Sequence, residues 1–386
     1  MQIAFFGSSL VSAYWNGAAT YYRGIVRALA ERGHRVTFYE PDAYDRQRHR
    51  DIPDPEWARV VVYPGTGEDG VLRALESARG ADLVVKASGV GVFDALLERE
   101  VLHLQRAGTL VAFWDVDAPA TLARVHDDAA DPFRACIPRY DLVFTYGGGE
   151  PVVRAYRARG ARRCVPVYNA LDPRTHHPVP ADARFAADCV LLANRLPDRE
   201  ARIAEFFFRA ATLAPGRRFV LGGNGWDGHA MPANVRALGH VYTADHNAVN
   251  CSARAVLNVH RDSMIANGWS PATRLFEAAG AAACQITDAW QGVEEFLEPG
   301  CEVLVAHDGA EVAAHLDALT PERARAIGDA AFRRVMAEHT YAHRAAQVER
   351  VLDGIVASGE GLAPVAGGVG TTVGASVGTA RPELTA

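Results

Sequence analysis

The chain has 386 residues, of which 49% are hydrophobic and 22% are charged, and its formal net charge is −6 at pH 7. This length predicts about two domains, since a domain usually spans roughly 100 to 200 residues. The composition is typical of a folded globular protein, and the negative charge gives no reason to expect a nucleic acid as partner.

Two further features concern location and redox chemistry. No stretch approaches the run of about 18 apolar residues that crosses a membrane, and residues 1–7 lack the basic start of a signal peptide, so a cytoplasmic protein without a transmembrane segment is expected. The six cysteines stand singly, without C-x-x-C spacing. They are predicted to be free thiols, and neither a disulfide framework nor a zinc ribbon is indicated.

The first half of the chain alternates short apolar runs with helix-like and loop-like sequence. An apolar run at residues 2–6 ends at Gly7, a helical pattern follows at 18–32, and another apolar run begins at Arg35. This order is typical of a parallel β-α-β unit, and an open α/β sheet is therefore predicted. Further strands are expected at residues 60–63, 82–86, 109–114, 142–146 and 164–168.

The same rhythm restarts after residues 172–182, which are rich in Pro, His and Asp and read as a linker. Helices are expected near 199–213, from Pro271 and over 321–356, and strands at residues 189–193, 218–221, 255–259, 283–286 and 302–305. Two doubly wound domains follow from this repetition. The predicted units are an N-terminal domain at 1–175, a C-terminal domain at 186–340, a last helix at 341–358 that joins the first domain, and a disordered tail at 361–386.

Ligands of open parallel sheets bind beyond the carboxyl ends of the strands, which directs attention to residues 267–277. Ser270 is predicted to cap a helix whose first residue is Pro271, and the free N–H groups at such a helix start can hold a pyrophosphate. Glu277 is expected on the helix face of Ser270 and Arg274, where its carboxylate could accept hydrogen bonds from two ribose hydroxyls. A solvated surface glutamate is the alternative.

Three arginines follow the predicted strand at 189–193. Arg195 comes directly after it, and Arg199 and Arg202 come one and two turns later, so their guanidinium groups could reach phosphate oxygens. Arg195 is favoured because of its place at the strand end. Surface positions are the alternative for Arg199 and Arg202.

Two weaker signals lie further along the second half. Gly222 and Gly223 would let the backbone approach a ligand, although a tight turn explains them equally well. His246 follows Asp245 at an expected helix start and could touch a base or a phosphate, with a structural role as the alternative.

In the first half, Asp115 and Asp117 end the predicted strand at 109–114. This D-x-D pattern could form a metal site, supply a general base or bind an acceptor, or cap the next helix. Function is favoured for Asp115, and both readings stay open for Asp117. The loop with Asn16 and Gly17 lacks G-x-G-x-x-G spacing, which argues against a dinucleotide-dependent dehydrogenase.

The second half resembles the glycosyltransferases called group 1, or family 4. Tyr168-Asn169-Ala170-Leu171-Asp172 is similar to the family's pNGvD segment, and Leu275-Phe276-Glu277-Ala278-Ala279-Gly280 to its llEAmAcG segment. Residues 193–196, 221–225 and 286–296 match other family segments in the right order. A closer resemblance, to the spore-maturation CgeB-type branch, rests on residues 15–24, 113–119, 270–277 and 339–344.

This resemblance implies a GT-B fold, in which two Rossmann-like domains face a cleft, and a nucleotide-sugar donor held by the second domain without a catalytic metal. It implies that Glu277 binds ribose and that Arg195 and Arg199 neutralise the diphosphate. One departure is Trp269, which stands eight positions before Glu277 where the wider family has an earlier glutamate. The predicted donor-binding residues are Arg195, Arg199, Gly222, Gly223, Tyr242, His246, Gly268, Trp269, Ser270, Arg274 and Glu277.

The function expected is transfer of a sugar from a nucleoside diphosphate, with UDP- or dTDP-sugars favoured, to an acceptor hydroxyl. Asp115 and Asp117 are the predicted catalytic residues, and Asn16 and Gly17 the predicted residues on the acceptor side. No cofactor and no nucleic acid partner are expected, and the acceptor could be a glycan, a lipid-linked molecule, a protein or a small molecule. A nucleotide-sugar epimerase and a non-catalytic sugar-nucleotide-binding protein are the alternatives.

Overall fold

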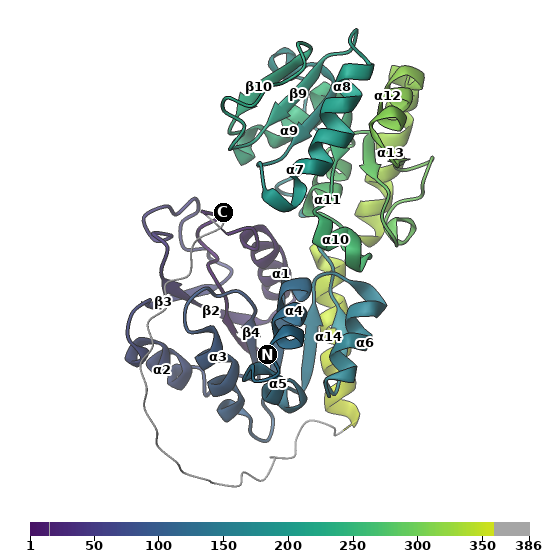
Figure 1. The fold of residues 1–386 in the computed structure, drawn as a ribbon. Helices are drawn as coiled ribbons and strands as arrows, with labels where there is room; N and C mark the ends of the chain where they lie inside the picture. Colours follow the sequence, from purple (N-terminus) through teal and green to yellow (C-terminus); the bar gives the residue numbers. More distant parts are fainter. Residues whose placement is uncertain (15, 359–386) are drawn as a thin grey trace.

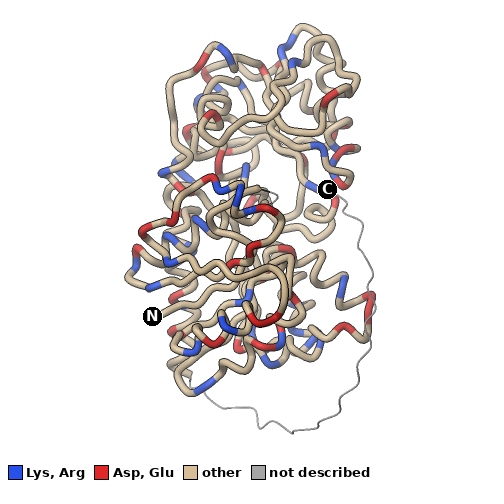
Figure 2. The backbone as a smooth tube through the Cα atoms, turned by 90° about the vertical axis from the view of Figure 1, so that its left-hand side faces the viewer, with Lys and Arg blue, Asp and Glu red and all other residues tan. Residues whose placement is uncertain are grey.

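The computed structural model describes residues 1–14 and 16–358, and the predicted tail at 361–386 lies outside them. Two parallel sheets form two lobes, with strand orders β3-β2-β1-β4-β5-β6-β7 and β10-β9-β8-β11-β12-β13 (Figure 1). The prediction of two doubly wound α/β domains is therefore confirmed. Basic and acidic residues are interspersed along both lobes (Figure 2). Among the described helices, none is long and apolar enough to cross a lipid bilayer.

The first sheet is covered by helices on both faces, which is why β4 and β5 consist only of buried residues. Helices α1 and α14 pack on one face, and α2, α3, α4 and α6 on the other. The strands are β1 Gln2–Phe6, β2 Arg35–Asp42, β3 Arg59–Pro64, β4 Leu83–Ala87, β5 Leu110–Asp115, β6 Leu142–Thr145 and β7 Cys164–Pro166. The helices are α1 Ala19–Glu31, α2 Glu68–Ser77, α3 Asp94–Glu100, α4 Ala118–Asp127, α5 Phe133–Cys136 and α6 Gly149–Ala158, with short 3-10 turns at Val101–Leu104 and Ile137–Arg139.

The second sheet is built in the same way, with α9 and α11 on one face and α7, α8, α12 and α13 on the other. Its strands are β8 Ala187–Leu192, β9 Phe219–Gly222, β10 Val235–Gly239, β11 Ala253–Asn258, β12 Gln285–Asp288 and β13 Leu304–Ala306. Its helices are α7 Pro197–Ile203, α8 Arg209–Leu213, α9 Thr243–Ser252, α10 Asp262–Asn267, α11 Thr273–Gly280, α12 Gly309–Ala318 and α13 Pro321–Glu338, with a π-helical turn at Ala204–Phe208 and 3-10 turns at Ala183–Phe185 and Val293–Glu295.

Strand β10 is the strand that sequence analysis missed. It pairs only with β9 at the edge of the sheet, and each of its residues is exposed or half-buried. Without a buried face, the strand has no need of the continuous apolar run by which the inner strands were recognised.

The helical segment predicted over 321–356 is divided into two helices: α13 ends at Glu338, and α14 spans Tyr341–Ser358, the limits predicted for the last helix. Between the two helices, His339 and Tyr341 form backbone hydrogen bonds with Leu171, which lies just before the linker. Its N–H donates to His339 O at 2.8 Å, and Tyr341 N–H donates to its carbonyl at 3.0 Å. The break lets α14 cross back and lie beside α1 in the first lobe (Figure 1).

The contact between α14 and α1 leaves no room for a side chain at Gly24, since a Cβ there would lie 2.2 Å from the Tyr341 ring. We expect Gly24→Ala to lower the free energy of unfolding by about 1–3 kcal/mol, the usual cost of overpacking. Urea denaturation measures this change. Gly354→Ala in α14 is the matched control: a Cβ there meets no atom of the described residues within 4 Å, and we expect it to stabilise by about 0.5–1 kcal/mol. Equal effects of the two variants would contradict this account.

Candidate functional site

Loops at the carboxyl ends of the two sheets meet between the domains. Gly148, after β6, donates its N–H to the carbonyl of Trp269 at 2.8 Å, and Asn169 of the linker donates its side-chain amide to Pro271 O at 3.3 Å. Helix α10 also contacts α4 and α6. Because ligands of parallel sheets bind beyond these strand ends, the polar groups that surround this junction form the candidate site.

Trp269 forms the centre of the contact between the domains. Its φ of +39° lies in the left-handed region, and its N–H donates to Gln291 O at 2.6 Å. Its side chain lies so close to Gly149 and Gly292 that a Cβ at either glycine would approach it within 2.7 Å and 2.4 Å, respectively. Gly268 before it has a φ of +64°. The predicted donor-binding residue Trp269 thus contacts the first domain, whereas the described neighbours of Gly268 belong to its own domain.

The predicted cap of the next helix is wrong. Helix α11 begins at Thr273, and its N-cap is Ala272, which makes no side-chain cap hydrogen bond. Ser270 is buried and its hydroxyl donates instead to the carbonyl of Gly268 at 2.8 Å. Ala272 is extended, with φ −65° and ψ 145°, so the helix begins two residues after its predicted first residue, Pro271.

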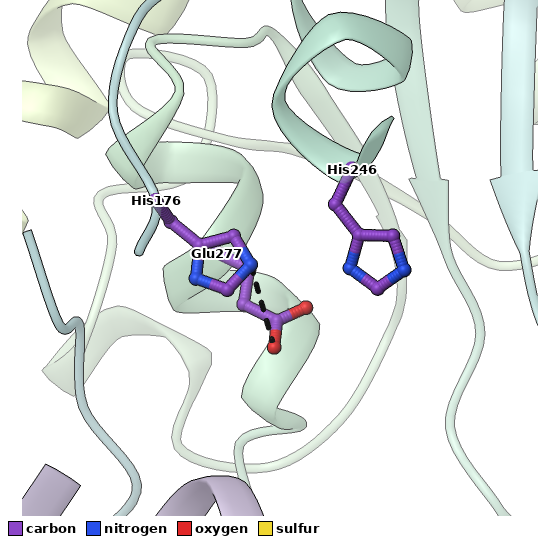
Figure 3. A group of neighbouring side chains, drawn as sticks. All are labelled: His176, His246 and Glu277. Carbon is purple, nitrogen blue, oxygen red and sulfur yellow. Dashed lines mark ion pairs between the residues drawn. The ribbon is translucent and has the colours of Figure 1, made fainter. Parts of the chain in front are cut away.

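Several polar atoms near this junction, Asn169 Oδ1 among them, are buried and have no hydrogen-bond partner within residues 1–14 and 16–358, and five others of this kind are electrostatically coupled or neighbouring. These five come from the linker, from α7, from α9 and from α11. They are His176 Nε2, Arg199 Nε, His246 Nδ1, Arg274 Nη1 and Glu277 Oε2. Figure 3 shows His176, His246 and Glu277 side by side. Because an unpaired buried polar atom costs about 1–3 kcal/mol, a group of five is best explained by a polar ligand that completes them.

The charges of this cluster are strongly coupled. Burial, followed by the positive charges of Arg274 and Arg261, lowers the pKa of Arg199 to about 10. Burial alone would raise the pKa of Glu277, but Arg274 and the neighbouring histidines outweigh it, so that the pKa lies below its ordinary value. Three arginines close enough to repel one another favour an anion, and a buried ionised carboxylate beside them favours hydrogen-bond donors.

His246 is held in its uncharged form. Burial and the charge of Arg274 lower its pKa to about 4, so the imidazole is neutral at physiological pH. Its Nε2 lies 3.3 Å from the carbonyl of Val241. Its Nδ1 has no hydrogen-bond partner among the described residues, and the contact of His246 with a ligand stays a prediction.

Three arginines were candidates: Arg195 before α7, and Arg199 and Arg202 within it. Only Arg199 belongs to the group of five unpaired atoms. Arg199 contributes the unpaired Nε, whereas Arg195 is exposed and pairs with Glu200 at 2.6 Å. Arg202 binds the buried carboxylate of Asp288 at 2.6 Å. The preference for Arg195 over Arg199 therefore does not agree with this arrangement.

The paired glycines after β9 are explained by packing. A Cβ on Gly223 would lie 2.1 Å from the carbonyl of Ala193, and a Cβ on Gly222 would lie 2.5 Å from Leu192. The close approach of β8 and β9 thus requires both glycines, without reference to a ligand. Tyr242, at the start of α9, is 68% exposed.

Asp115 lies at the end of β5 and is fully buried. Its carboxylate accepts hydrogen bonds from the hydroxyls of Ser88, Thr121 and Tyr156 and from the N–H of Asp117. Burial raises the pKa of Asp115 even though these donors oppose the shift. The predicted preference for a functional Asp115 is not supported by these contacts, because its carboxylate holds the loop in place and none of it is exposed.

Asp117 is the exposed member of the pair. It caps α4 by accepting a hydrogen bond from Ala120 N–H at 3.4 Å. Its charge also acts across the junction: burial and then Asp117 raise the pKa of Tyr146 to about 12, and Asp198 and Asp117 outweigh the effect of burial on the pKa of Arg261. Asp117 thus caps α4 and also lies close to the second domain.

The two residues predicted on the acceptor side have different surroundings. The buried Asn16 side chain accepts from the Ser8 hydroxyl at 2.8 Å and donates to the carbonyls of Ser9 and Ser12. All of these partners belong to its own loop, which indicates a structural role. Gly17 is exposed, and a Cβ there would meet no atom of the described residues within 4 Å.

Sequence reasoning missed His176 and Arg261 as members of the site. Arg261 comes shortly after the buried strand β11, a position that the search of strand ends could have included. His176 lies in the linker, where no periodicity predicts the direction of a side chain. It reaches the site because its linker segment runs past α11, where the carbonyl of His176 would lie 3.0 Å from a Cβ on Gly280.

Comparisons with known proteins agree with this geometry. Residues 199–350 match the sequence model of a family described as Glycosyl transferase-like. No curated protein matches the chain by sequence.

Solved structures match nearly the whole chain. Sucrose-phosphate synthase from Thermosynechococcus elongatus is 15% identical, with a TM-score of 0.64 and coverage of 93% of this chain and 100% of its own. Anabaena HepE in complex with UDP-glucose is 14% identical, with a TM-score of 0.65 and coverage of 92% and 100%. T4 phage BGT in complex with UDP-glucose is 11% identical, with a TM-score of 0.59 and the same coverage. The chain therefore has the GT-B fold of these structures, and its residues 199–350 are similar to a glycosyl transferase-like family.

Proposed function

We propose that this protein transfers a sugar from a nucleoside diphosphate to an acceptor hydroxyl. The observation that carries this proposal is the group of five buried polar atoms without hydrogen-bond partners among the described residues, which combines guanidinium groups with a carboxylate and two imidazoles. A nucleoside diphosphate has the complementary groups, since its diphosphate is an anion and its sugar offers hydroxyl donors.

The leaving group is stabilised by arginine in this proposal. Arg199 and Arg274 bind the diphosphate, and their charge-assisted hydrogen bonds strengthen as negative charge develops during transfer. The acceptor oxygen bonds to the anomeric carbon while the bond from that carbon to the diphosphate oxygen breaks, and the diphosphate leaves with the electron pair. Glu277 binds the ribose, as the family resemblance implies.

The acceptor enters from the first domain. Asp117 is exposed there, and its charge acts on Arg261 and Tyr146 at the junction. In this proposal its carboxylate takes the proton of the acceptor hydroxyl, as a general base positioned on the other side of the reacting carbon from Arg199. Asp115 positions this loop through its hydrogen bonds to Ser88 and Thr121.

Several finer features belong to the same proposal. The segments at 15–24, 113–119, 270–277 and 339–344 support membership of the CgeB-type branch. Arginines in place of a bound cation support a mechanism without a catalytic metal. UDP-glucose complexes of HepE and T4 phage BGT support a UDP-sugar as donor. The domain limits at 175 and 186, the cytoplasmic location and the classes of acceptor stay predictions.

A measurement of UDP binding tests the proposed donor site in the second domain. We expect Arg199→Ala to weaken the binding of UDP by about tenfold to hundredfold, because it removes charge-assisted hydrogen bonds to the diphosphate. Isothermal titration calorimetry in the presence of EDTA measures this affinity. Arg209→Ala, which removes an exposed arginine paired with Glu205, is the matched control and should bind UDP like the natural protein. Unchanged affinity in Arg199→Ala would move the donor site elsewhere, and a natural protein that binds no nucleoside diphosphate would refute the function.

A measurement of sugar transfer tests the proposed general base in the first domain. Asp117→Ser keeps a side-chain oxygen that can cap α4 but removes the carboxylate, so we expect unfolding in urea at nearly the same concentration and at least a hundredfold lower turnover of a UDP-sugar. Asp115→Ala should behave differently, with a loss of stability of about 2–4 kcal/mol, because it leaves buried hydroxyls without their acceptor. If Asp117→Ser keeps full turnover, another group is the base.

A further inference from the structure

An ion pair lies at the junction beside the group of five unpaired atoms. Arg261, which follows β11, donates its Nε–H to Asp198 Oδ2 at 2.5 Å, and Asp198 lies in the first turn of α7. Both side chains are accessible, with 44% of Arg261 and 34% of Asp198 exposed. The pair therefore presents charged groups to solvent near the carboxyl ends of the strands of the second sheet.

The neighbours of this pair lie in both domains. Arg199 is the residue after Asp198, and its pKa is lowered by burial and by the charges of neighbouring arginines, Arg261 among them. Helix α10 begins directly after Arg261 and contacts α4 and α6 of the first domain. Burial lowers the pKa of Arg261, but the hydrogen bond and charge of Asp198, followed by the charge of Asp117, outweigh it. Arg261 is thus close to the proposed diphosphate contact and to the proposed general base.

The reaction requires the sugar to lie in this same place. The carbon that the acceptor attacks is bonded to the diphosphate, so the sugar ring must lie between the arginine that binds the diphosphate and the carboxylate that activates the acceptor. Under the proposed function, these groups are Arg199 and Asp117. Side chains that are close to both can therefore contact the sugar itself.

The ion pair keeps hydrogen-bonding atoms available for such a contact. Among the described residues, the N–H groups on Nη1 and Nη2 of Arg261 donate no hydrogen bond, and Asp198 Oδ1 accepts none. A hydroxyl group both donates and accepts hydrogen bonds, and an arginine beside a carboxylate offers a donor and an acceptor at adjacent positions. The free atoms of this pair therefore match the hydroxyl groups of a sugar.

The charge balance distinguishes a sugar from a phosphate as the ligand of Arg261. Asp198 offsets the positive charge of Arg261 at hydrogen-bond distance, and Asp117 adds a further negative charge nearby. Arg199, in contrast, donates to the uncharged carbonyl of Asn194 at 2.8 Å, and its buried Nε has no partner in the described part of the chain. An anion is therefore attracted to Arg199, whereas the paired Arg261 suits uncharged hydroxyl groups.

We propose that Arg261 and Asp198 together bind hydroxyl groups of the donor's sugar, and that this pair selects a neutral sugar over one that carries a carboxylate. A sugar carboxylate would lie close to Asp198 and Asp117 and be repelled by both. Trp269 does not supply these contacts, because its indole N–H already donates to Glu295. The inference rests on the proposed function and deepens it, since it names the class of sugar that is transferred.

The experiment compares a nucleotide with its sugar nucleotides by isothermal titration calorimetry in EDTA. The probes are UDP with UDP-glucose and UDP-galactose, or dTDP with dTDP-glucose if the natural protein binds dTDP more tightly than UDP. We expect Arg261→Met to weaken the binding of the tightest sugar nucleotide about tenfold to hundredfold. The affinity for the nucleotide alone should change less than about threefold, because Asp198 already offsets the charge of Arg261. Arg261→Lys keeps the charge but loses the planar donor group, and we expect it to behave like Arg261→Met.

A matched control and a charged sugar complete the experiment. Arg184→Met is the control, because it breaks an ion pair of the same domain, with Asp182 at 2.6 Å, just before the amino end of β8. We expect it to change neither affinity. The glucuronate of the same nucleotide should bind the natural protein at least about tenfold more weakly than the glucose compound. Asp198→Asn removes one negative charge but keeps an acceptor oxygen, and we expect it to reduce this difference.

Each possible failure has a distinct result. If Arg261→Met weakens the nucleotide and the sugar nucleotide equally, Arg261 binds the diphosphate, and the inference is refuted while the proposed function stands. Unchanged binding of the sugar nucleotide in both Arg261 variants, or binding of the nucleotide alone by the natural protein, refutes the inference in the same way. Tighter binding of the glucuronate than of the glucose compound refutes the selection of a neutral sugar. If neither UDP nor dTDP binds, the proposed function fails as well.

Discussion

The candidate site depends on the contact between Trp269 and the glycines after β6. Gly148 donates its N–H to the carbonyl of Trp269, and Gly149 leaves space for the Trp269 side chain. A residue with a Cβ at position 149 would push the two domains apart at the point where their strand ends meet. The separation between Asp117 in one domain and Arg199 in the other is therefore set by backbone packing at a single junction, and not by a direct bond between the reactive groups.

Around this junction, several buried polar groups have no hydrogen-bond partner among the described residues. Other buried carboxylates are well paired, as where Asp115 accepts four hydrogen bonds or where Asp288 binds both His260 and Arg202. The contrast matters because an unsatisfied buried group lowers stability, and selection for stability alone would remove it. We read the satisfied clusters as framework and the unsatisfied one as the place prepared for a ligand.

Most of the fold was predictable because each inner strand can be recognised from its own run of residues. Continuous apolar runs identified the inner strands, and the edge strand β10 was missed because it has no buried face. The site was predictable only in part. Glu277 and Arg199 follow from helix spacing, but whether Arg195 turns to Glu200 or to a phosphate depends on tertiary contacts. His176 depends on the path of a linker, which periodicity does not describe.

Trp269 has a consequence for how the transferred sugar is held. The wider family has a glutamate at this position, eight residues before Glu277, and the resemblance assigns that glutamate to the sugar ring. Here the indole N–H binds Glu295, and the ring packs against Gly149 and Gly292, so the position is committed to joining the domains. Contacts to the sugar must then come from other loops at the junction, and the first domain supplies the exposed carboxylate of Asp117 there. Under the proposed function, a domain contact in place of a sugar contact would couple recognition of the sugar to the way the two lobes meet.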